Sequence, residues 1–170
     1  MDEARFGRIR DARSCWAPYG VRPSVSAQVI REFIYAYAAV SPSDGHLDAL
    51  VLPEVNADSM SLFLQEVSEN HKDDHVVMIM DRAGWHTAKG VHIPDNITLH
   101  WLPAYSPELN PVEHLWDEIR EKWFYNRVFS SLDAVEDQLV ISLAYLIHTP
   151  DLVKSLTLFR WLHNSLLNAN

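Results

Sequence analysis

Residues 76–81 read Val-Val-Met-Ile-Met-Asp, and residues 97–102 read Ile-Thr-Leu-His-Trp-Leu. Short apolar runs of this kind are typical of buried strands in parallel sheets. The first run ends on Asp81, and Gly84 then allows the backbone to turn sharply before an expected short helix. Because open α/β sheets bind ligands beyond the carboxyl ends of their strands, Asp81 is expected at such an edge.

Upstream of these strands the sequence predicts a hairpin and a helix. Residues 32–40 and 46–52 are rich in aromatic and β-branched residues and flank a turn that contains proline and glycine. A helix capped by Asn56 or Asp58 then runs to about Asn70. Its expected apolar face consists of Met60, Phe63, Leu64 and Val67. Shorter apolar-polar stretches at 4–10 and 13–17 precede the hairpin.

Downstream of residue 102 the pattern becomes helical. Asn110 is predicted to cap a helix that has Pro111 in its first turn and ends near Phe124. Residues 130–133 form a capping-box pattern that opens a second helix, and a last helix is expected from Thr149. The apolar positions expected of that last helix are Leu152, Leu156, Phe159, Leu162 and Leu166. Early strands followed by alternating strands and helices indicate an α/β domain.

The bulk composition is that of an ordinary globular protein. The chain has 170 residues, 48% apolar and 22% charged, which fits a single domain over residues 1–170. No apolar run is long enough for a bilayer and no secretion signal is evident, so no membrane association is expected. The single cysteine, Cys15, excludes an internal disulfide and suits a cytoplasmic protein.

The charge is unevenly distributed along the chain. Residues 1–31 carry six arginines, Arg5 and Arg22 among them, against three acids, a local charge of +3. The whole chain has a net charge of −9, which leaves −12 for residues 32–170. An arginine-bearing edge on an acidic body fits a metal-dependent DNA enzyme, because arginine binds phosphate bidentately. Scattered solvated charges would give the same composition.

Two acids have sequence positions that suit metal binding. Asp81 ends a buried strand, and Glu113 lies at the start of the helix that follows Asn110. Two divalent ions about 3.5–4 Å apart can drive phosphodiester chemistry with only a few carboxylate ligands. Each acid also has a structural alternative: Asp81 could close a turn, and Glu113 could bond back to Asn110 in a capping box.

The segment Ser106–Trp116, Ser-Pro-Glu-Leu-Asn-Pro-Val-Glu-His-Leu-Trp, resembles a motif of DDE-superfamily transposases. The relevant members are bacterial insertion-sequence enzymes related to the mariner group. The segments that begin Asp2-Glu3-Ala4-Arg5-Phe6-Gly7 and Asp81-Arg82-Ala83-Gly84-Trp85-His86 are similar to two further family motifs. The resemblance covers nearly the whole chain. It implies a ribonuclease-H-like fold, with a mixed five-stranded sheet flanked by helices and a helical C-terminal tail.

The resemblance also implies a site and an activity. Asp2, Asp81 and Glu113 would bind Mg²⁺ or Mn²⁺, as two ions, for DNA strand cleavage and strand transfer. One partner would be double-stranded DNA, both the terminal repeats of the mobile DNA element and the target site. The other would be a second copy of the chain, in an active homodimer. Supporting or DNA-contacting roles are expected for Arg5, Arg22, Trp85, His86, Tyr105, Ser106 and Asn110. A bacterial transposase would be cytoplasmic and associated with the nucleoid.

Two features depart from the family pattern. We expect this chain not to include the helix-turn-helix DNA-binding region that full-length members carry, and only Met1 precedes Asp2 in the first strand. Either that strand is short and frayed, or the chain is a fragment, such as the product of the downstream one of two overlapping open reading frames. Two alternative functions therefore remain open: a non-catalytic fragment that inhibits intact transposase, and a ribonuclease-H-like nuclease.

Overall fold

The computed structural model describes every residue except 10–11, 85, 87–89, 160–161 and 163–170. Five strands and four α-helices make up the described part of the chain. The strands are β1 (Asp2–Gly7), β2 (Phe33–Ser41), β3 (His46–Leu52), β4 (Val76–Met80) and β5 (Ile97–Trp101). The α-helices are α1 (Ala57–Asn70), α2 (Val112–Ile119), α3 (Leu132–Ile147) and α4 (Pro150–Thr157). The α/β class predicted from the sequence is confirmed.

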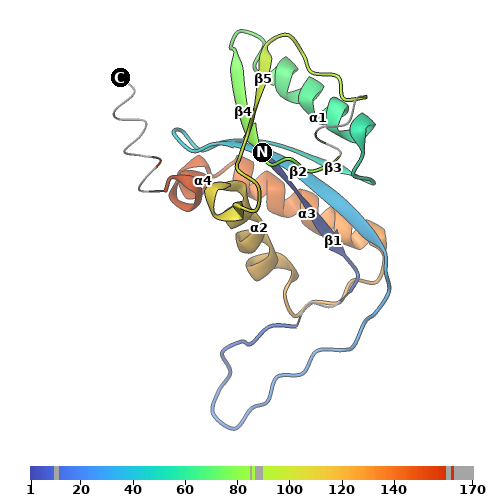
Figure 1. Cartoon of the computed structure of the whole chain (residues 1–170). Helices are drawn as coiled ribbons and strands as arrows, with labels where there is room; N and C mark the ends of the chain where they lie inside the picture. Colours follow the sequence, from blue (N-terminus) through green and yellow to red (C-terminus); the bar gives the residue numbers. More distant parts are fainter. Residues whose placement is uncertain (10–11, 85, 87–89, 160–161, 163–170) are drawn as a thin grey trace.

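The five strands form two sheets, so the expectation of one mixed sheet is corrected. Strands β1, β2 and β3 form an antiparallel sheet, and β4 and β5 form a separate parallel pair. Among the described residues, one hydrogen bond joins the edges of the sheets, from the Met1 nitrogen to the Ile79 carbonyl oxygen at 2.8 Å. A single bond of this kind does not make a continuous ladder. It nevertheless brings the start of β1 beside β4 (Figure 1).

Strand β1 is fully paired rather than frayed. All six of its residues have partners on β2, from Asp2 opposite Ala38 to Gly7 opposite Phe33. Alternation along the strand directs Ala4 and Phe6 into the core beneath the helices. The same alternation places Asp2 on their side of the sheet and Glu3 on the other.

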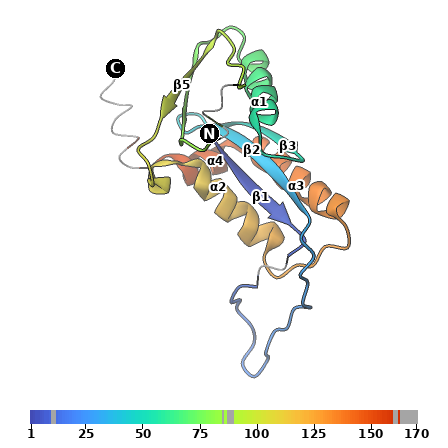
Figure 2. The same ribbon diagram turned by 45° about the vertical axis from the view of Figure 1, so that its right-hand side comes forward.

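Helices cover both faces of the three-stranded sheet. Helices α2, α3 and α4 pack on one face, around buried Trp116, Leu139 and Leu146 (Figures 1 and 2). Helix α1 packs on the other face together with β4 and β5. Its buried residues are Met60, Phe63, Leu64 and Val67, the four predicted from periodicity. Asn56 caps this helix by accepting a hydrogen bond from the Ser59 nitrogen at 2.8 Å.

Two predictions about helices need correction. Helix α2 begins at Val112 with Pro111 at its cap position, one residue later than predicted. Asn110 still supports the start of the helix: its Oδ1 accepts a hydrogen bond from the Val112 nitrogen at 3.3 Å, while its amide donates to the Met1 carbonyl at 3.2 Å. A π-helical turn, Arg120–Phe124, extends α2 to the predicted end. Helix α4 ends at Thr157, short of the expected tail through Leu166, most of which lies outside the described residues.

Between β1 and β2 the chain makes a long excursion away from the body (Figure 1). Most of its described residues are exposed, including Trp16, Tyr19 and Arg22. An ion pair between Arg8 and Glu32, 2.7 Å long, joins the two ends of this excursion. No single helix in the described part of the chain has the length and apolar character to cross a membrane. Helices α3 and α4 pass that test only as a pair, bent by 90°.

Candidate active site

Three carboxylates from distant parts of the chain meet where β1, β4 and α2 begin or end. Asp2 is the first residue of β1, Asp81 directly follows β4, and Glu113 lies in the first turn of α2. Their charges act on one another: Glu113 influences Asp2, and Asp81 influences Glu113. Their oxygens do not, however, all lie within 4.8 Å of one another.

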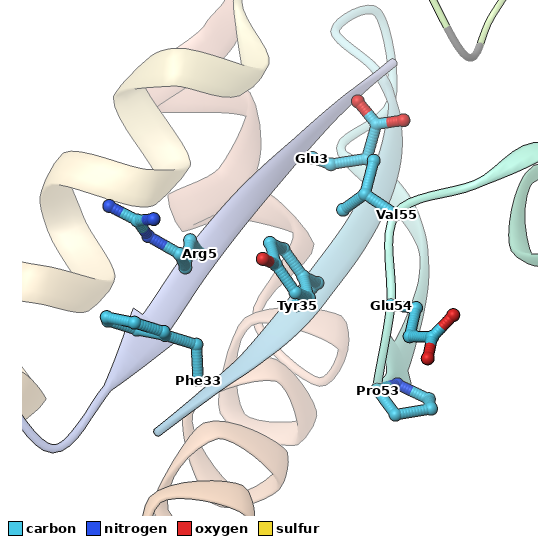
Figure 3. Close-up of a pocket in the computed structure, with 7 residues that line it drawn as sticks. All are labelled: Glu3, Arg5, Phe33, Tyr35, Pro53, Glu54 and Val55. Carbon is cyan, nitrogen blue, oxygen red and sulfur yellow. The ribbon is translucent and has the colours of Figure 1, made fainter. Parts of the chain in front are cut away.

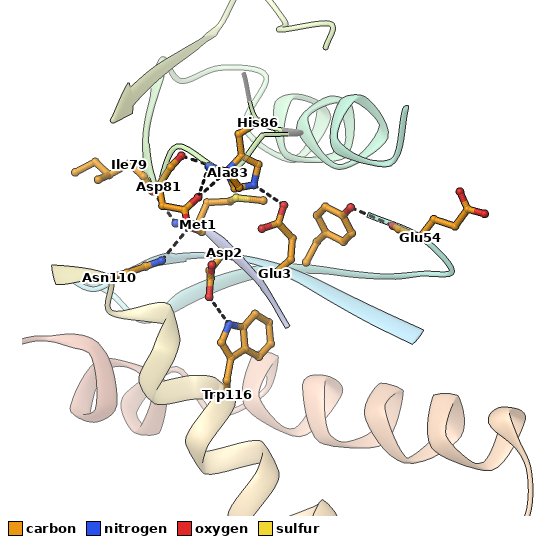
Figure 4. Close-up of polar contacts among 11 residues, drawn as sticks. Met1, Asp2, Glu3, Glu54, Ile79, Asp81, Ala83, His86, Asn110 and Trp116 are labelled. Carbon is orange, nitrogen blue, oxygen red and sulfur yellow. Dashed lines mark hydrogen bonds and ion pairs between the residues drawn. The ribbon is translucent and has the colours of Figure 1, made fainter. Parts of the chain in front are cut away.

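Asp2 is held by the helix layer. The indole Nε1–H of Trp116 donates to Asp2 Oδ2 at 2.8 Å (Figure 4). Burial, and then the negative charge of Glu113, raise the pKa of Asp2 to about 7, although the Trp116 hydrogen bond acts in the opposite direction. A carboxyl with this pKa is only partly ionised near neutral pH, and a nearby cation would favour its ionised form.

Asp81 is the most accessible of the three acids, with its side chain 56% exposed. Its Oδ1 accepts a hydrogen bond from the Ala83 nitrogen at 3.0 Å, so the turn expected as a structural alternative is present. The same oxygen lies 2.9 Å from His86 Nδ1. The turn and the histidine both hold Oδ1, so these contacts are compatible with a ligand role for Oδ2.

His86 connects Asp81 to Glu3 on β1. Its ring is buried, and Nε2 lies 2.5 Å from Glu3 Oε1 while Nδ1 faces Asp81 (Figure 4). Burial acts to lower the pKa of His86, but the hydrogen bond and charge of Glu3, with Asp81, raise it above its usual value. The ring therefore favours its charged form between two carboxylates.

Glu113 is half-buried and does not close a capping box. The Asn110 backbone N–H that such a box would use donates instead to the Pro107 carbonyl at 2.9 Å. No described residue donates a hydrogen bond to the Glu113 carboxylate. Burial raises the pKa of Glu113; the Arg120 guanidinium opposes this shift, and the charges of Asp117 and Asp81 add to it. This carboxylate remains available to a cation.

The remaining predicted residues surround this cluster at different distances. Asn110 is buried and joins the start of α2 to the start of β1. Tyr105 is fully exposed with φ of 58°, and the Ser106 hydroxyl donates to the Ala104 carbonyl at 3.4 Å, so both shape the turn before α2. Arg5 stacks over the Phe33 ring at 4.4 Å. Trp85 lies outside the described residues.

Two hollows flank β1. An open one of about 730 Å³ lies on the Glu3 side and is also lined by Arg5, Tyr35 and Glu54 (Figure 3). The second, of about 340 Å³, lies at the far end of the strand, where Arg5, Arg120 and Arg127 line it with aromatic residues. Arg120 thus lines this basic hollow, and its charge also acts to lower the pKa of Glu113.

Sequence reasoning missed the role of Glu3. Strand alternation directs Glu3 away from Asp2, to the face of the sheet where it meets His86, 83 residues further along the chain. Two signals were visible in the sequence: Glu3 is an acid next to the candidate ligand Asp2, and His86 lies five residues after the candidate ligand Asp81. Their pairing depends on how β1 and β4 meet, which local patterns do not specify.

Comparison with known proteins assigns the chain to a family. A model of the DDE superfamily endonuclease family matches residues 1–136. A protein of Sinorhizobium fredii (strain NBRC 101917 / NGR234), described as uncharacterized protein y4pE/y4sA, is 39% identical over 132 residues. That match covers 77% of this chain and 98% of the relative. The chain therefore belongs to the DDE superfamily endonucleases, which confirms the family expected from its motifs.

Solved structures support the fold. The Mos1 transposase paired-end complex with left transposon end is 19% identical, with a TM-score of 0.61 over 92% of this chain. The Mos1 strand transfer complex is likewise 19% identical, with a TM-score of 0.61 over 91% of this chain. The chain spans about half the length of these structures, covering 53% and 52% of them. At this identity the likeness establishes a shared fold.

Proposed function

We propose that this chain is the catalytic domain of a DDE transposase, which cleaves DNA strands at the ends of a mobile element and transfers them to a target. The observation that carries the proposal is the convergence of Asp2, Asp81 and Glu113 from three separate elements. The family match to a DDE endonuclease supports the same reading. It also favours this activity over the two alternatives left open by the sequence.

The donor set fits a hard divalent cation. All three candidate ligands are carboxylates, which Mg²⁺ and Mn²⁺ prefer, and burial and mutual repulsion raise the pKa values of Asp2 and Glu113. A pair of ions bound here would neutralise charge on the attacking and leaving oxygens of a phosphodiester. Structures of a Mos1 mariner paired-end complex with Mn resemble this chain in fold, with a TM-score of 0.59.

The chain's own residues prepare this site in three ways. Trp116 holds one oxygen of Asp2 and leaves the other directed away from the helix. His86 holds Asp81 and is itself fixed by Glu3, an arrangement that orients a ligand and keeps it ionised. Asn110 ties the first turn of α2 to β1, which keeps Glu113 close to Asp2.

Arginines close to the acidic cluster offer contacts for a DNA backbone. Arg5 and Arg120 line one hollow beside β1, and the charge of Arg120 acts on Glu113. Arg22 lies exposed on the excursion between β1 and β2. Since the rest of the chain is acidic, we propose that phosphates approach along these arginines. We also propose a homodimer as the active form, because an element has two ends to be joined.

Nicking of supercoiled plasmid DNA in Mn²⁺ tests the activity without a known recognition sequence. The parent should nick the plasmid, and Asp2→Asn, Asp81→Asn and Glu113→Gln should each reduce nicking to the metal-free background. Glu108→Gln is the matched control, because Glu108 is an exposed acid of the same motif and should keep full activity. Equal nicking by all variants would assign the activity to a contaminant and contradict the proposal.

The same preparations separate the alternatives. If the chain is a non-catalytic inhibitor, it would leave the plasmid intact. The parent chain and its Asp81→Asn variant would then inhibit an intact transposase to the same extent. A ribonuclease-H-like nuclease would cleave an RNA–DNA hybrid in preference to duplex DNA that carries the element's ends. The transposase proposal requires cleavage of the duplex and loss of that cleavage in Asp81→Asn.

A further inference from the structure

A second group of metal-ligating side chains lies on a different part of the sheet. His46, Asp48 and His71 each place one ligand atom within 4.8 Å of the other two, and they form the one such group among the described residues. His46 and Asp48 begin β3, and His71 directly follows α1. None of the three belongs to the acidic cluster around Asp2.

The acidic cluster and this group are well separated. Asp48 pairs with Ala39 on β2, and β2 lies between β3 and β1, so the two groups are two strand spacings apart, roughly 10 Å. They also use opposite faces of the sheet, because Asp48 bonds the end of α1 while Asp2 bonds Trp116 on α2. A ligand at one group would not share side chains with the other.

The distances within the group suit a small transition-metal ion. His71 Nε2 lies 2.9 Å from Asp48 Oδ2, and His46 Nε2 lies 3.5 Å from Asp48 Oδ1. Ligand atoms at the corners of a zinc tetrahedron with bonds near 2.0–2.1 Å are about 3.3 Å apart. The two imidazole rings meet edge to face, with centroids 4.9 Å apart and an interplanar angle of 82°.

Asp48 has the surroundings of a supported ligand. Its carboxylate is only 7% exposed, and the amide of Asn70 donates to Oδ1 at 2.9 Å, which fixes its orientation. No lysine or arginine among the described residues forms an ion pair with it. A buried carboxylate is normally paired with a cation or bound to a metal.

We propose that His46, Asp48 and His71 form a zinc site that fastens the start of β3 to the end of α1. Two nitrogen donors and one carboxylate favour Zn²⁺ over Mg²⁺, which prefers oxygen ligands throughout. His46 is 51% exposed, so the fourth position faces solvent and a water molecule can complete a tetrahedron. This site is distinct in its metal and in its place from the proposed catalytic centre.

Zn²⁺ and Co²⁺ titrations of the full chain, followed by calorimetry and by visible absorption of Co²⁺, test the proposal. His46→Ala and His71→Ala remove one ligand each. His46 is half exposed, so His46→Ala should keep the parent's fold, which circular dichroism checks for both variants. His75→Ala is the matched control, because His75 is an exposed histidine close in sequence that bonds Thr98 instead. Asp81→Asn controls for metal taken up by the acidic cluster.

The parent, His75→Ala and Asp81→Asn should each bind Zn²⁺ at this site. Their unfolding midpoints should rise by roughly 5–10 °C at free Zn²⁺ about a hundredfold above the dissociation constant. His46→Ala and His71→Ala should bind at least about tenfold more weakly and lose most of that rise. Unchanged Zn²⁺ affinity and an unchanged rise in these two variants would show that the group is a hydrogen-bond network only, and would overturn the proposal.

Discussion

Replacing Asp2 with asparagine should stabilise the metal-free protein above neutral pH while removing a proposed metal ligand. Asp2 has a folded-state pKa of about 7 against an ordinary value of 3.8, because burial and Glu113 disfavour its charge. A shift of about three units corresponds to an upper limit of about 4 kcal/mol of lost stability once the carboxyl is ionised. Asparagine is neutral and can still accept the Trp116 hydrogen bond, so a gain of about 1–4 kcal/mol is expected at pH 8.

The pH dependence of this gain gives the sharper test. The folded protein binds the Asp2 proton more tightly than the unfolded chain does. The destabilisation is therefore absent below pH 4, grows between pH 4 and 7, and is complete above pH 7. Urea unfolding in EDTA at pH 4.5 and pH 8 would measure it, with Asp137→Asn, an exposed acid on α3, as the control. A variant that is less stable than the parent at pH 8, or equally stabilised at both pH values, would refute this reasoning.

Three further substitutions probe other parts of the account. His86→Asn should weaken Mn²⁺ binding by about 10–100-fold in calorimetry, because Asp81 loses its orienting partner, whereas exposed His100→Asn should not. Gly45→Ala should lower the free energy of unfolding by at least about 2 kcal/mol in urea. Its φ is 80°, and an added Cβ would approach the Pro150 carbonyl oxygen to 2.0 Å. Leu139→Ala should cost about 2–5 kcal/mol by the same measurement, since Leu139 is fully buried; a cost below 1 kcal/mol would contradict the described core.

Local patterns predicted the regular elements well. The bounds of β3 and β4 were predicted to the residue, and those of β2 and β5 to within one. Alternating or continuous apolar runs flanked by turn residues specify such strands without long-range information. The cap and the buried face of α1 followed from the same kind of short-range signal.

Predictions that depended on distant contacts were less successful. Asn110 accepts from the Val112 nitrogen at the start of α2, as a capping residue would, but its amide also bonds a carbonyl 109 residues away, which local patterns did not predict. Helix α4 ended early, and beyond it Phe159 packs edge to face against His114, a contact that apolar periodicity could not foresee. The break between the two sheets likewise depends on how the start of β1 meets β4.

The candidate site was predicted in its parts but not in its connections. Motif resemblance named Asp2, Asp81 and Glu113, and the fold brings their charges within reach of one another. The link from Asp81 through His86 to Glu3 emerged only from the three-dimensional arrangement. The second histidine group also joins residues from separate elements, and no spacing in the sequence marks it.

The most direct test of the central claim is calorimetric titration of Mn²⁺ into the chain bound to a DNA duplex. The same titration is made with Asp2→Asn, Asp81→Asn, Glu113→Gln and the control Glu108→Gln. The parent and the control should bind Mn²⁺ alike, and each of the other three variants should lose this binding. Mn²⁺ binding that persists unchanged in all three variants would contradict a metal centre formed by these carboxylates.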